Sequence, residues 1–481
     1  MQRVTHDRPW PLHDVAATRA IERDAAASLP RHALMQRAGL AVARLALALA
    51  PHARGVWIAC GPGNNGGDGL EAAIHLKASQ RRVVVTWSGD ESRMPADAAA
   101  ALQRARLAGV NFASEPPADF DLAIDAMLGL GSTRPLQGPL AAWARIINGA
   151  RSPVLAVDTP SGLAADTGTG VAVRASCTLS LLTLKPGLFT AGGRDHVGDL
   201  WFDELGGAPS HEPVAWLSGR STPRPRVHAS HKGSYGDVAV IGGAAGMAGA
   251  ALLAGSAALH AGAGRVFVSL LGDPMPVDSH QPELMFRAWE SLDLGAMSLA
   301  CGCGGGAAMQ DALPAVLARS RSLVLDADAL NVIAHEPPLQ HALRQRSVSG
   351  QVTVLTPHPL EAARLLGCST TEIQSDRLVA ARELSQRFAC IVVLKGSGTI
   401  VASPANLPCI NPTGNARLAT GGTGDVLAGL IAARLAAATN TATATDDAFA
   451  ATVSAVYDHG LAADRWPALH ALTASGLARA I

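Results

Sequence analysis

The sequence predicts an α/β protein with two domains, and three observations lead to this prediction. The chain has 481 residues, 48% of which are hydrophobic, and its 39 basic side chains balance its 39 acidic ones, which excludes a disordered chain. Short apolar runs alternate with helical stretches, and this pattern lapses once. A chain of this length has room for two or three cores of roughly 100–200 residues each. Strands and helices in alternation predict parallel sheets with helices on both faces.

The alternation is clearest at the start of the chain, and we expect a Rossmann-like three-layer domain over residues 1–205. Helices are expected between the strands, for example over residues 68–79 and 97–107. The apolar runs that predict strands are residues 56–60, 82–87, 121–128, 154–158 and 178–184.

Residues 206–226 interrupt the pattern, because they are rich in Pro, Gly and Ser and show no sustained period. We expect a linker there. A second α/β domain is expected over residues 227–481, with a helix that opens near Gly424 and a surface loop at residues 436–445. Its predicted strands are residues 238–241, 265–271, 323–326, 352–356 and 390–395.

Composition and charge exclude several functions. The formal net charge of zero gives no general attraction for nucleic acid. Seven cysteines without a CxxC pair indicate neither a zinc site nor a disulfide framework, so we expect a reducing, cytoplasmic location. The polar N-terminus has no apolar signal core. Residues 238–264 lack charged side chains, but their Gly and Ala content favours a strand, a loop and a buried helix over a membrane span.

Lysine is rare in this chain, with Arg at almost every basic position. The four lysines are Lys77, Lys185, Lys232 and Lys395, and the last three lie in turns that contain Gly or Pro. Because a lysine is a compact point charge and an arginine a flat fork, a site that needs the former does not accept the latter. We therefore expect functional lysines among these three.

A glycine-rich loop, GPGNNGGDG at residues 61–69, follows the first predicted strand and precedes a helix. Backbone amides in such a turn close on an anion at the positive end of the helix. Asn64 and Asn65 add amide groups beyond what a turn requires. Asp68 is either part of this site or the N-cap of the helix.

Acidic residues also end two later strands. Asp125 and Asp158 stand where parallel strands present their carboxyl ends to a ligand crevice. Oxygen atoms of Asn65, Asp125 and Ser161, together with backbone carbonyls, would suit a hard cation, either monovalent or divalent.

These motifs resemble the NAD(P)H-hydrate epimerase domain. The strings that carry the resemblance, which covers residues 10–205, are HALMQRAG, GPGNNGGDG, DAMLGLG, AVDTPSGL and LTLKPGLFTAGG. The resemblance implies a potassium ion on Asn65, Asp125 and Ser161. It also implies contacts to the hydrated nucleotide from Asn64, Asn65, Gly66, Gly67, Asp68, Gly129, Leu130, Gly131, Ser132, Thr133, Arg134, Pro135 and Asp158. Leu130 departs from the family, which usually has a threonine there.

Epimerisation needs little from the protein. The C6 hydroxyl of the hydrate departs with help from the ring nitrogen lone pair and returns on the other face, so proton transfer and charge stabilisation suffice. Asp158 is the expected acid-base group, and its alternative role is as a hydrogen-bond acceptor for a ribose.

The most specific string of the second half is NPTGNARLATGGTGDVLAGLIAARL, residues 411–435. Residues 420–424 (TGGTG) leave free amides at the start of an apolar helix, and Asp425 stands in its first turn. An anion hole with a carboxylate beside it is the arrangement that phosphoryl transfer requires. The alternative is that Asp425 only stabilises the helix start through the dipole.

Three further segments belong with this anion hole. LKGSGT at residues 394–399 ends a strand with one of the rare lysines, and His358 and Glu361 open a helix. Asp326 and Asp328 follow another strand, where they would hold magnesium directly or through water, or cap a helix.

The second half resembles the ADP-dependent NAD(P)H-hydrate dehydratases, which have a ribokinase-like fold. The resemblance covers residues 225–481 and includes HKGSYGDVAVIGGAAGMAGA, AGAGRVFV and PELM. In the turn at residues 302–306 the family tends to read GPGLG where this chain has GCGGG. The implied hydrate contacts are Ala250, Gly304, Gly306, His358 and Asp425. The implied contacts to ADP are Lys395, Gly396, Ser397, Gly398, Thr399 and Gly424.

Together the two resemblances imply one repair pathway. The first domain would interconvert the epimers of hydrated NADH and NADPH, and the second would dehydrate the (S)-epimer with ADP and Mg²⁺. Asp425 would take the hydroxyl proton while the oxygen attacks the phosphoryl group. The expected partners are these small molecules and a second copy of the chain in a homo-oligomer. A kinase for a vitamin precursor and a nucleotide-sensing module are the alternatives.

Overall fold

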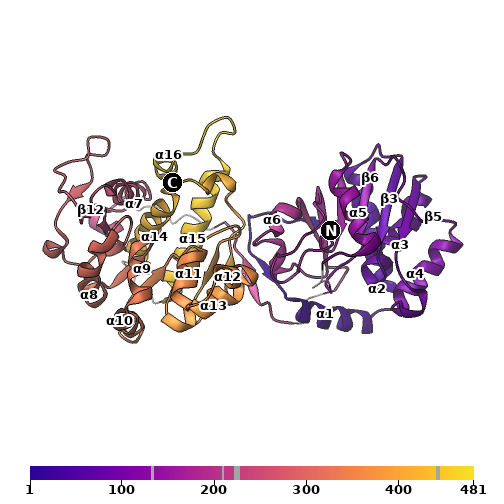
Figure 1. Ribbon diagram of the computed structural model, residues 1–481, viewed down its shortest axis with the longest axis horizontal. Coiled ribbons are helices and arrows are strands. Elements are labelled where there is room, and N and C mark those ends of the chain that lie inside the picture. The colour runs from indigo at the N-terminus through magenta and orange to yellow at the C-terminus, as the bar shows by residue number, and fades with distance from the viewer. Residues whose placement is uncertain (132–134, 208–210, 221–227, 440–444) are drawn as a thin grey trace. The chain divides into compact units, whose positions relative to one another are not determined.

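The computed structural model describes residues 1–131, 135–207, 211–220, 228–439 and 445–481. These residues form two compact units, one made of Met1–Thr5 with Trp10–Trp216 and the other of His6–Pro9 with Leu217–Ile481. Each unit is a mixed layer of strands and helices (Figure 1), so the predicted α/β class is confirmed. Within the described part of the chain, no helix is both long and apolar enough to cross a bilayer.

The first unit contains a sheet with the strand order β1-β9-β8-β7-β6-β3-β4-β5. All neighbouring strands are parallel except β1, which is antiparallel to β9. Its strands are β1 (Gln2–Arg3), β3 (Gly55–Cys60), β4 (Arg82–Trp87), β5 (Asn111–Ala113), β6 (Leu122–Ala126), β7 (Val154–Val157), β8 (Cys177–Leu181) and β9 (Asp199–Asp203). Its helices are α1 (Val15–Ala27), α2 (Ala33–Leu49), α3 (Asn64–Ala78), α4 (Ala96–Leu107), α5 (Gly138–Gly149) and α6 (Gly193–His196). Short strands β2 (Trp10–Leu12) and β10 (Ala215–Leu217) complete the list, and β10 lies inside the expected linker.

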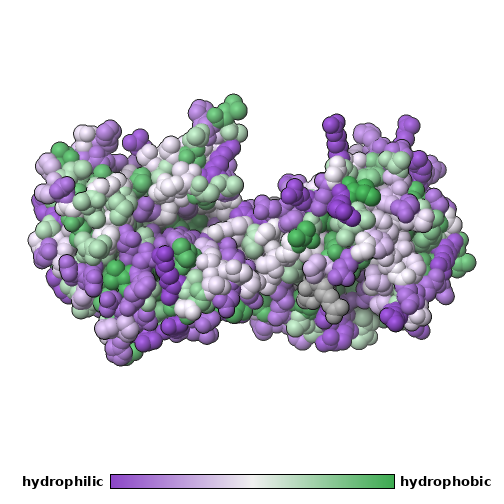
Figure 2. Space-filling view, viewed as in Figure 1, coloured by the Kyte–Doolittle hydropathy of each residue, from purple (hydrophilic) through white to green (hydrophobic). Residues whose placement is uncertain are grey.

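Successive residues of β3 face opposite sides of this sheet, as the period of a strand requires. Val56 and Ile58 join a core with α2, α3 and α4, whereas Trp57 and Ala59 join a second core with α5. The two cores make the unit a three-layer structure. Apolar residues are thereby drawn inward, and Figure 2 shows hydrophilic residues over much of the visible surface of each unit.

The site of the first unit is set by where the strand order reverses. The chain runs from β3 to β4 and β5 at one edge, then returns to β6 on the other side of β3. In open parallel sheets a crevice forms at the carboxyl ends of the strands at this switch point. The strand ends Cys60 and Ala126 are neighbours in the register.

Helix α3 begins four residues earlier than predicted. Asn64 is its first residue and Gly63 its N-cap, so of the two alternatives for Asp68, the one in which it caps the helix is wrong. The glycines permit close backbone contacts, since a Cβ on Gly61 would lie 1.7 Å from the Met127 carbonyl oxygen. The two asparagines therefore sit on a helical turn rather than on a loop.

The second unit contains a sheet with the order β13-β12-β11-β14-β15-β16-β17-β18-β19, parallel as far as β17. Its strands are β11 (Asp237–Gly242), β12 (Arg265–Leu270), β13 (Met285–Phe286), β14 (Ser298–Cys301), β15 (Ser322–Leu325), β16 (Val352–Leu355), β17 (Ile391–Leu394), β18 (Ile400–Ala402) and β19 (Cys409–Ile410). Its helices are α7 (Ala248–His260), α8 (Met309–Arg319), α9 (Asp328–His335), α10 (Pro337–Val348), α11 (Pro359–Leu366), α12 (Thr370–Ser375), α13 (Arg377–Phe388), α14 (Thr423–Thr439), α15 (Thr445–Asp464) and α16 (Ala474–Arg479).

The strand order of this sheet also reverses, between β11 and β14, and α14 begins there. Helix α14 lies between α7 and α15 (Figure 1). Helices α7 and α14 pack on β11, α15 contacts β16, and all three belong to one core with Val238 and Val240. The prediction of a surface loop over residues 436–445 is wrong at both of its bounds, because α14 continues to Thr439 and α15 begins at Thr445. Residues 440–444 lie outside the described part of the chain. Ala436 is buried in the core, which explains why the helix continues. The uncharged stretch at residues 238–264 forms β11 and α7, as predicted.

Candidate active sites

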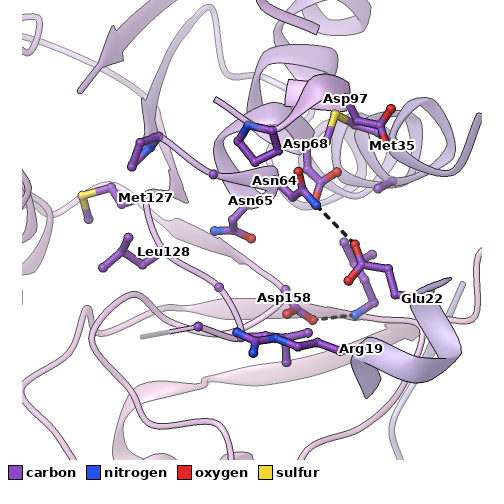
Figure 3. Close-up of a pocket in the computed structure, with 18 of the residues that line it drawn as sticks. Arg19, Glu22, Met35, Asn64, Asn65, Asp68, Asp97, Met127, Leu128 and Asp158 are labelled. Carbon is purple, nitrogen blue, oxygen red and sulfur yellow. Dashed lines mark hydrogen bonds between the residues drawn. The ribbon is translucent and has the colours of Figure 1, made fainter. Parts of the chain in front are cut away.

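A cavity of about 760 Å³ lies at the switch point of the first unit (Figure 3). Its walls come from α1, the first turns of α3, the segment after β6 and the residue that follows β7. The polar and charged side chains that line it are Thr18, Arg19, Glu22, Asn64, Asn65, Asp68, Asp97, Gln137 and Asp158.

Most sequence-predicted residues of the first site reach this cavity. Gly66 and Gly67 are buried in the first turns of α3 behind it. Ser132, Thr133 and Arg134 lie outside the described residues. The predicted residues that line the cavity are Asn64, Asn65, Asp68, Gly129, Leu130, Gly131, Pro135 and Asp158.

Asp158 is held in an unusual conformation. Its backbone φ is +65°, in the left-handed region that only a few non-glycine residues occupy. Its Oδ1 accepts a hydrogen bond from the Leu181 amide at 3.1 Å and forms an ion pair with the ammonium of Lys185, which is fully buried. Backbone strain of this kind persists where the surrounding contacts fix it, often at functional sites.

Two other carboxyl groups of the cavity hold their protons more tightly than usual. Burial, followed by repulsion from Asp158 and Glu22, raises the pKa of Asp68 well above its usual range. Burial and then the charge of Asp158 also raise the pKa of Glu22. The cavity therefore combines the ion pair of Asp158 with two carboxyl groups whose raised pKa values favour the protonated form.

Asp125, Ser161 and Asn65 lie together beside the cavity. Asp125 accepts hydrogen bonds from the Ser161 hydroxyl at 2.5 Å and the Ser161 amide at 2.8 Å, and burial raises its pKa to about 6. The Ser161 hydroxyl accepts from the Leu128 amide at 2.8 Å. A Cβ on Gly129 would lie 3.1 Å from Asn65 Oδ1, so the loop also approaches Asn65. The amide nitrogen of Asn65 is buried and has no hydrogen-bond partner among the described residues, so this amide has bonding capacity to spare.

The second site centres on Asp425, in the first turn of α14. Ligand atoms of Asp425, Asp326 and Cys303 lie within 4.8 Å of one another. Burial and then repulsion from Asp326 raise the pKa of Asp425 to about 6, although a hydrogen bond from the Cys303 thiol opposes this shift. Cys303 itself is fully buried. Because its pKa is about 6, Asp425 changes between the protonated and the ionised form close to neutral pH.

Lys395 joins the elements around Asp425. Its ammonium lies 2.6 Å from Asp326 Oδ1 and 4.0 Å from Glu361 Oε2. Burial opposes its charge, but these two carboxylates outweigh burial and raise the pKa of Lys395. A Cβ on Gly424 would lie 3.4 Å from the ammonium, which places the lysine at the amide-rich start of α14.

The turn that follows β17 continues from Lys395. Gly396 has a φ of +142°, and a Cβ there would meet the guanidinium of Arg377, a buried residue that donates to the Leu394 and Lys395 carbonyls. The hydroxyl of Thr399 donates to the Gly396 carbonyl at 3.0 Å. The predicted turn, Lys395, Gly396, Ser397, Gly398 and Thr399, is thus held by its own contacts and by Arg377, and its first residue lies against Gly424 at the start of α14.

The remaining predicted residues fall on two further elements of this edge. Gly304 has a φ of +59°, and a Cβ there would lie 2.9 Å from that of Ala250, so the turn contacts the start of α7. The Gly306 amide donates to Asp328 at 2.9 Å. His358 is the N-cap of α11, and its Nε2 lies 3.3 Å from Glu361.

Capping does not account for the two aspartates that follow β15. The N-cap of α9 is Ala327, at a φ of +49°, and no side chain caps the helix. Asp326 instead accepts from Lys395 and from the Thr356 hydroxyl at 2.7 Å. Its carboxylate is therefore oriented toward the site.

Several residues at these sites were not identified from the sequence. Arg19 and Glu22 belong to α1, a helix that no motif marks. The rarity of lysine pointed to Lys185, but not to its partner Asp158. Cys303 was noted only as a departure from the family, whereas its thiol contacts Asp425. Only the fold brings these groups together.

Comparisons with known proteins match both halves of the chain. A family described as NAD(P)H-hydrate dehydratase matches residues 238–481, and one described as YjeF-related protein N-terminus matches residues 31–187. The Bifunctional NAD(P)H-hydrate repair enzyme Nnr of Escherichia coli (strain K12) is 38% identical over 460 residues, covering 89% of this chain and 84% of that protein. The corresponding protein of Coxiella burnetii is 35% identical, covering 94% of each chain.

One solved structure is similar to the second half. It is an ADP/ATP-dependent NAD(P)H-hydrate dehydratase from Bacillus subtilis co-crystallised with ATP and Mg²⁺, 31% identical, with a TM-score of 0.43. It covers 54% of this chain and 92% of its own. On the full-length matches, the chain belongs to the family of bifunctional NAD(P)H-hydrate repair enzymes.

Proposed function

We propose that this chain repairs hydrated NADH and NADPH in two reactions. The first unit interconverts the (R)- and (S)-epimers at C6, and the second dehydrates the (S)-epimer at the expense of ADP, releasing AMP and phosphate. The observation that carries the proposal is the position of Asp425, a carboxylate beside both Lys395 and the glycine-lined start of α14. Relatives named as repair enzymes, which the chain matches over 84% and 94% of their own length, support it.

The second unit replaces a poor leaving group by a better one. Asp425 takes the proton of the C6 hydroxyl, and the oxygen attacks the β-phosphorus of ADP as AMP departs. The ring nitrogen lone pair then expels phosphate from C6, and loss of a proton from C5 gives the reduced nicotinamide. Lys395 and the free amides at the start of α14 stabilise the charge on the transferring group.

Side chains beside Asp425 are suited to a magnesium ion. Asp326 and Asp328 offer the carboxylate oxygens that Mg²⁺ prefers, and would hold the ion directly or through water. A bound Mg²⁺ supplies charge neutralisation on the diphosphate. Substrate contacts in this unit are assigned to Ala250, Gly304, Gly306 and His358, and nucleotide contacts to residues 395–399 and Gly424.

In the first unit, Asn65, Asp125 and Ser161 would hold potassium. The side-chain oxygens of Asn65, Asp125 and Ser161 lie together and are the kind of donor that an oxygen-coordinated ion requires. When bound, the ion offsets phosphate charge. The cavity residues bind the substrate and transfer the proton. The first turns of α3 and the segment after β6 bind the nucleotide, and Asp158 exchanges a proton at the C6 oxygen.

A single assay tests both reactions. The purified chain is mixed with both epimers of hydrated NADH, Mg²⁺, K⁺ and either ADP or ATP, and the near-ultraviolet absorbance of the reduced nicotinamide is followed. Full conversion of both epimers is expected. Conversion of the (S)-epimer alone would contradict the epimerase, and a stable phosphorylated alcohol would indicate a kinase instead.

Two expectations about the assembled protein complete the proposal. We expect a homo-oligomer, which light scattering on the purified chain tests. We also expect a cytoplasmic location, which fractionation of the source cells tests.

A further inference from the structure

Helix α1 forms one wall of the first cavity. Thr18, Arg19, Glu22 and Ala26 line the cavity, and their spacing places them on one face of the helix. The family match to this unit covers residues 31–187, so α1 lies outside the matched segment. The sequence motifs of the first half therefore say nothing about this wall.

The wall is fixed in place at its first turn. Asp14 caps the helix by accepting from the Ala17 amide at 2.7 Å. The Thr18 hydroxyl is 2.8 Å from that of Thr183, in the segment that leads to Lys185. Side chains on α1 are thus held against the segment that carries the ion pair of Asp158.

Glu22 is the carboxyl group that α1 presents to the cavity. Its Oε1 accepts a hydrogen bond from the Asn64 amide at 3.4 Å, and the Glu22 and Asp158 carboxyl groups point into the same space from different walls (Figure 3). The charged groups around Glu22 are Asp158, Asp68, Lys185 and Arg19. Burial and the charge of Asp158 raise the pKa of Glu22, so it keeps a proton to higher pH than an exposed glutamate.

Epimerisation needs two opposite proton transfers. A proton must reach the departing hydroxyl on one face of the ring, and another must leave the water that adds to the other face. Oδ1 of Asp158 accepts from the buried Lys185 ammonium and from the Leu181 amide, so Asp158 is assigned the part of the proton acceptor. A second group must supply the first proton.

We propose that Glu22 is the general acid of epimerisation and that Asp158 is the base on the opposite side of the ring. This inference rests on the proposed epimerase function. Glu22 donates its proton to the C6 oxygen, the C6–O bond breaks, and the ring nitrogen lone pair forms an N1=C6 iminium with release of water. A water molecule then adds to the other face of C6 and gives its proton to Asp158. After product release, Glu22 takes a proton from solvent water and Asp158 gives its proton to solvent, which restores both groups. In the reverse direction the two carboxyl groups exchange roles.

The charge of the cavity agrees with this path. The iminium is a cation, and after donation it is faced by two carboxylates, those of Glu22 and Asp158. Arg19, on the same face of α1, is placed for the anionic diphosphate of the same ligand. Arg19 and Glu22, both on the cavity face of α1, thus match opposite charges on the substrate.

The test is the Glu22→Gln variant of the full chain, which keeps the hydrogen bond to Asn64 but has no proton to donate. Starting from pure (R)-epimer, chromatography measures interconversion after subtraction of the uncatalysed rate. We expect kcat for epimerisation to fall by about 10²-fold, the usual contribution of a general acid, with KM little changed. The ADP-dependent dehydration of the (S)-epimer should be unaffected.

The pH profile separates a catalytic role from a structural one. Because the acid must be protonated, wild-type epimerisation should decline as pH rises, and Glu22→Gln should lack this alkaline decline while Glu22→Asp restores it. Asp24→Asn is the matched control, because Asp24 is an exposed acid on the same helix that does not line the cavity. An alkaline decline that survives in Glu22→Gln but is lost in Asp68→Asn would overturn the inference.

The proposed function and this inference fail differently. A wild-type chain that does not interconvert the epimers overturns both. A wild-type chain that does so, beside a Glu22→Gln variant of nearly equal rate, overturns only the role of Glu22.

Discussion

Each site contains a lysine whose ammonium is paired with a carboxylate. Lys185 is fully buried against Asp158, and Lys395 is paired with Asp326. Removal of one partner of a buried pair leaves a charge without compensation, which is far more harmful than removal of both. Because lysine is scarce in the sequence, we expected functional lysines in these turns, and the structure places Lys185 and Lys395 beside the two candidate sites.

Lys185→Met should therefore destabilise the first unit by about 3–5 kcal/mol, the usual effect of breaking a buried ion pair. Thermal unfolding monitored by circular dichroism measures the change. The double variant Lys185→Met with Asp158→Asn is the control and should recover part of the loss. Equal stability of the single and double variants would contradict the paired arrangement.

Asp425 has a pKa near 6, and its role as a base requires the ionised form. Dehydration should therefore fall as pH drops through about 6 and level off above it, in assays over roughly pH 5 to 8. Asp425→Asn should lower the turnover of the (S)-epimer by about 10²-fold or more and leave epimerisation intact.

Stability provides the control for this variant. The folded pKa of Asp425 is above its unfolded value, so its ionisation destabilises the folded unit as pH rises toward 6. Above that pH the unfolding temperature of Asp425→Asn should equal or exceed that of the wild type. A fall in both stability and turnover would indicate a structural role instead.

Helices and strands differ in how well the sequence predicts them. The strand at Arg82–Trp87 was predicted to the residue, because β-branched runs between polar turns have few alternatives. The start of α3 was missed because Gly and Asn disfavour helices locally, and the contacts of Gly61 with the Met127 segment override that preference. Helix α1 was missed as part of the site, because only the fold brings Glu22 to Asp158. Distance along the chain, rather than weak local signal, limits the prediction of the site.

Helices α7 and α14 approach closely at Gly429, where a Cβ would lie 2.0 Å from the Ala254 carbonyl oxygen. Gly429→Ala should therefore push α14 away from α7 and destabilise the second unit by about 1–3 kcal/mol, as overpacked cores do. Thermal unfolding measures this effect. Gly249→Ala in α7 is the control, because a Cβ there meets nothing within 4 Å. It should leave stability unchanged or raise it slightly, and a similar loss in both variants would contradict the close approach.

At the scale of the whole molecule, each unit has its own sheet, its own cores and its own site. The two reactions share a substrate, and the catalytic groups proposed for each reaction all belong to one unit. The chain is thus two enzymes in sequence.

Mixing an epimerase-deficient chain with a dehydratase-deficient chain should therefore restore complete repair of both epimers. Glu22→Gln and Asp425→Asn supply the two chains, and conversion of pure (R)-epimer to the reduced nicotinamide is the measurement. Each variant alone is the control and should convert this epimer slowly. A mixture no faster than either variant would show that the intermediate must pass directly within one chain.

The distribution of lysine has a practical consequence for handling the protein. The two exposed lysines are Lys77, near the end of α3 farthest from its cavity, and Lys232, which precedes β11 at the edge of the sheet opposite Asp425. Coupling to an amine-reactive support would anchor the chain through these side chains, which line neither the first cavity nor the surroundings of Asp425. Immobilised preparations should remain accessible to dinucleotides.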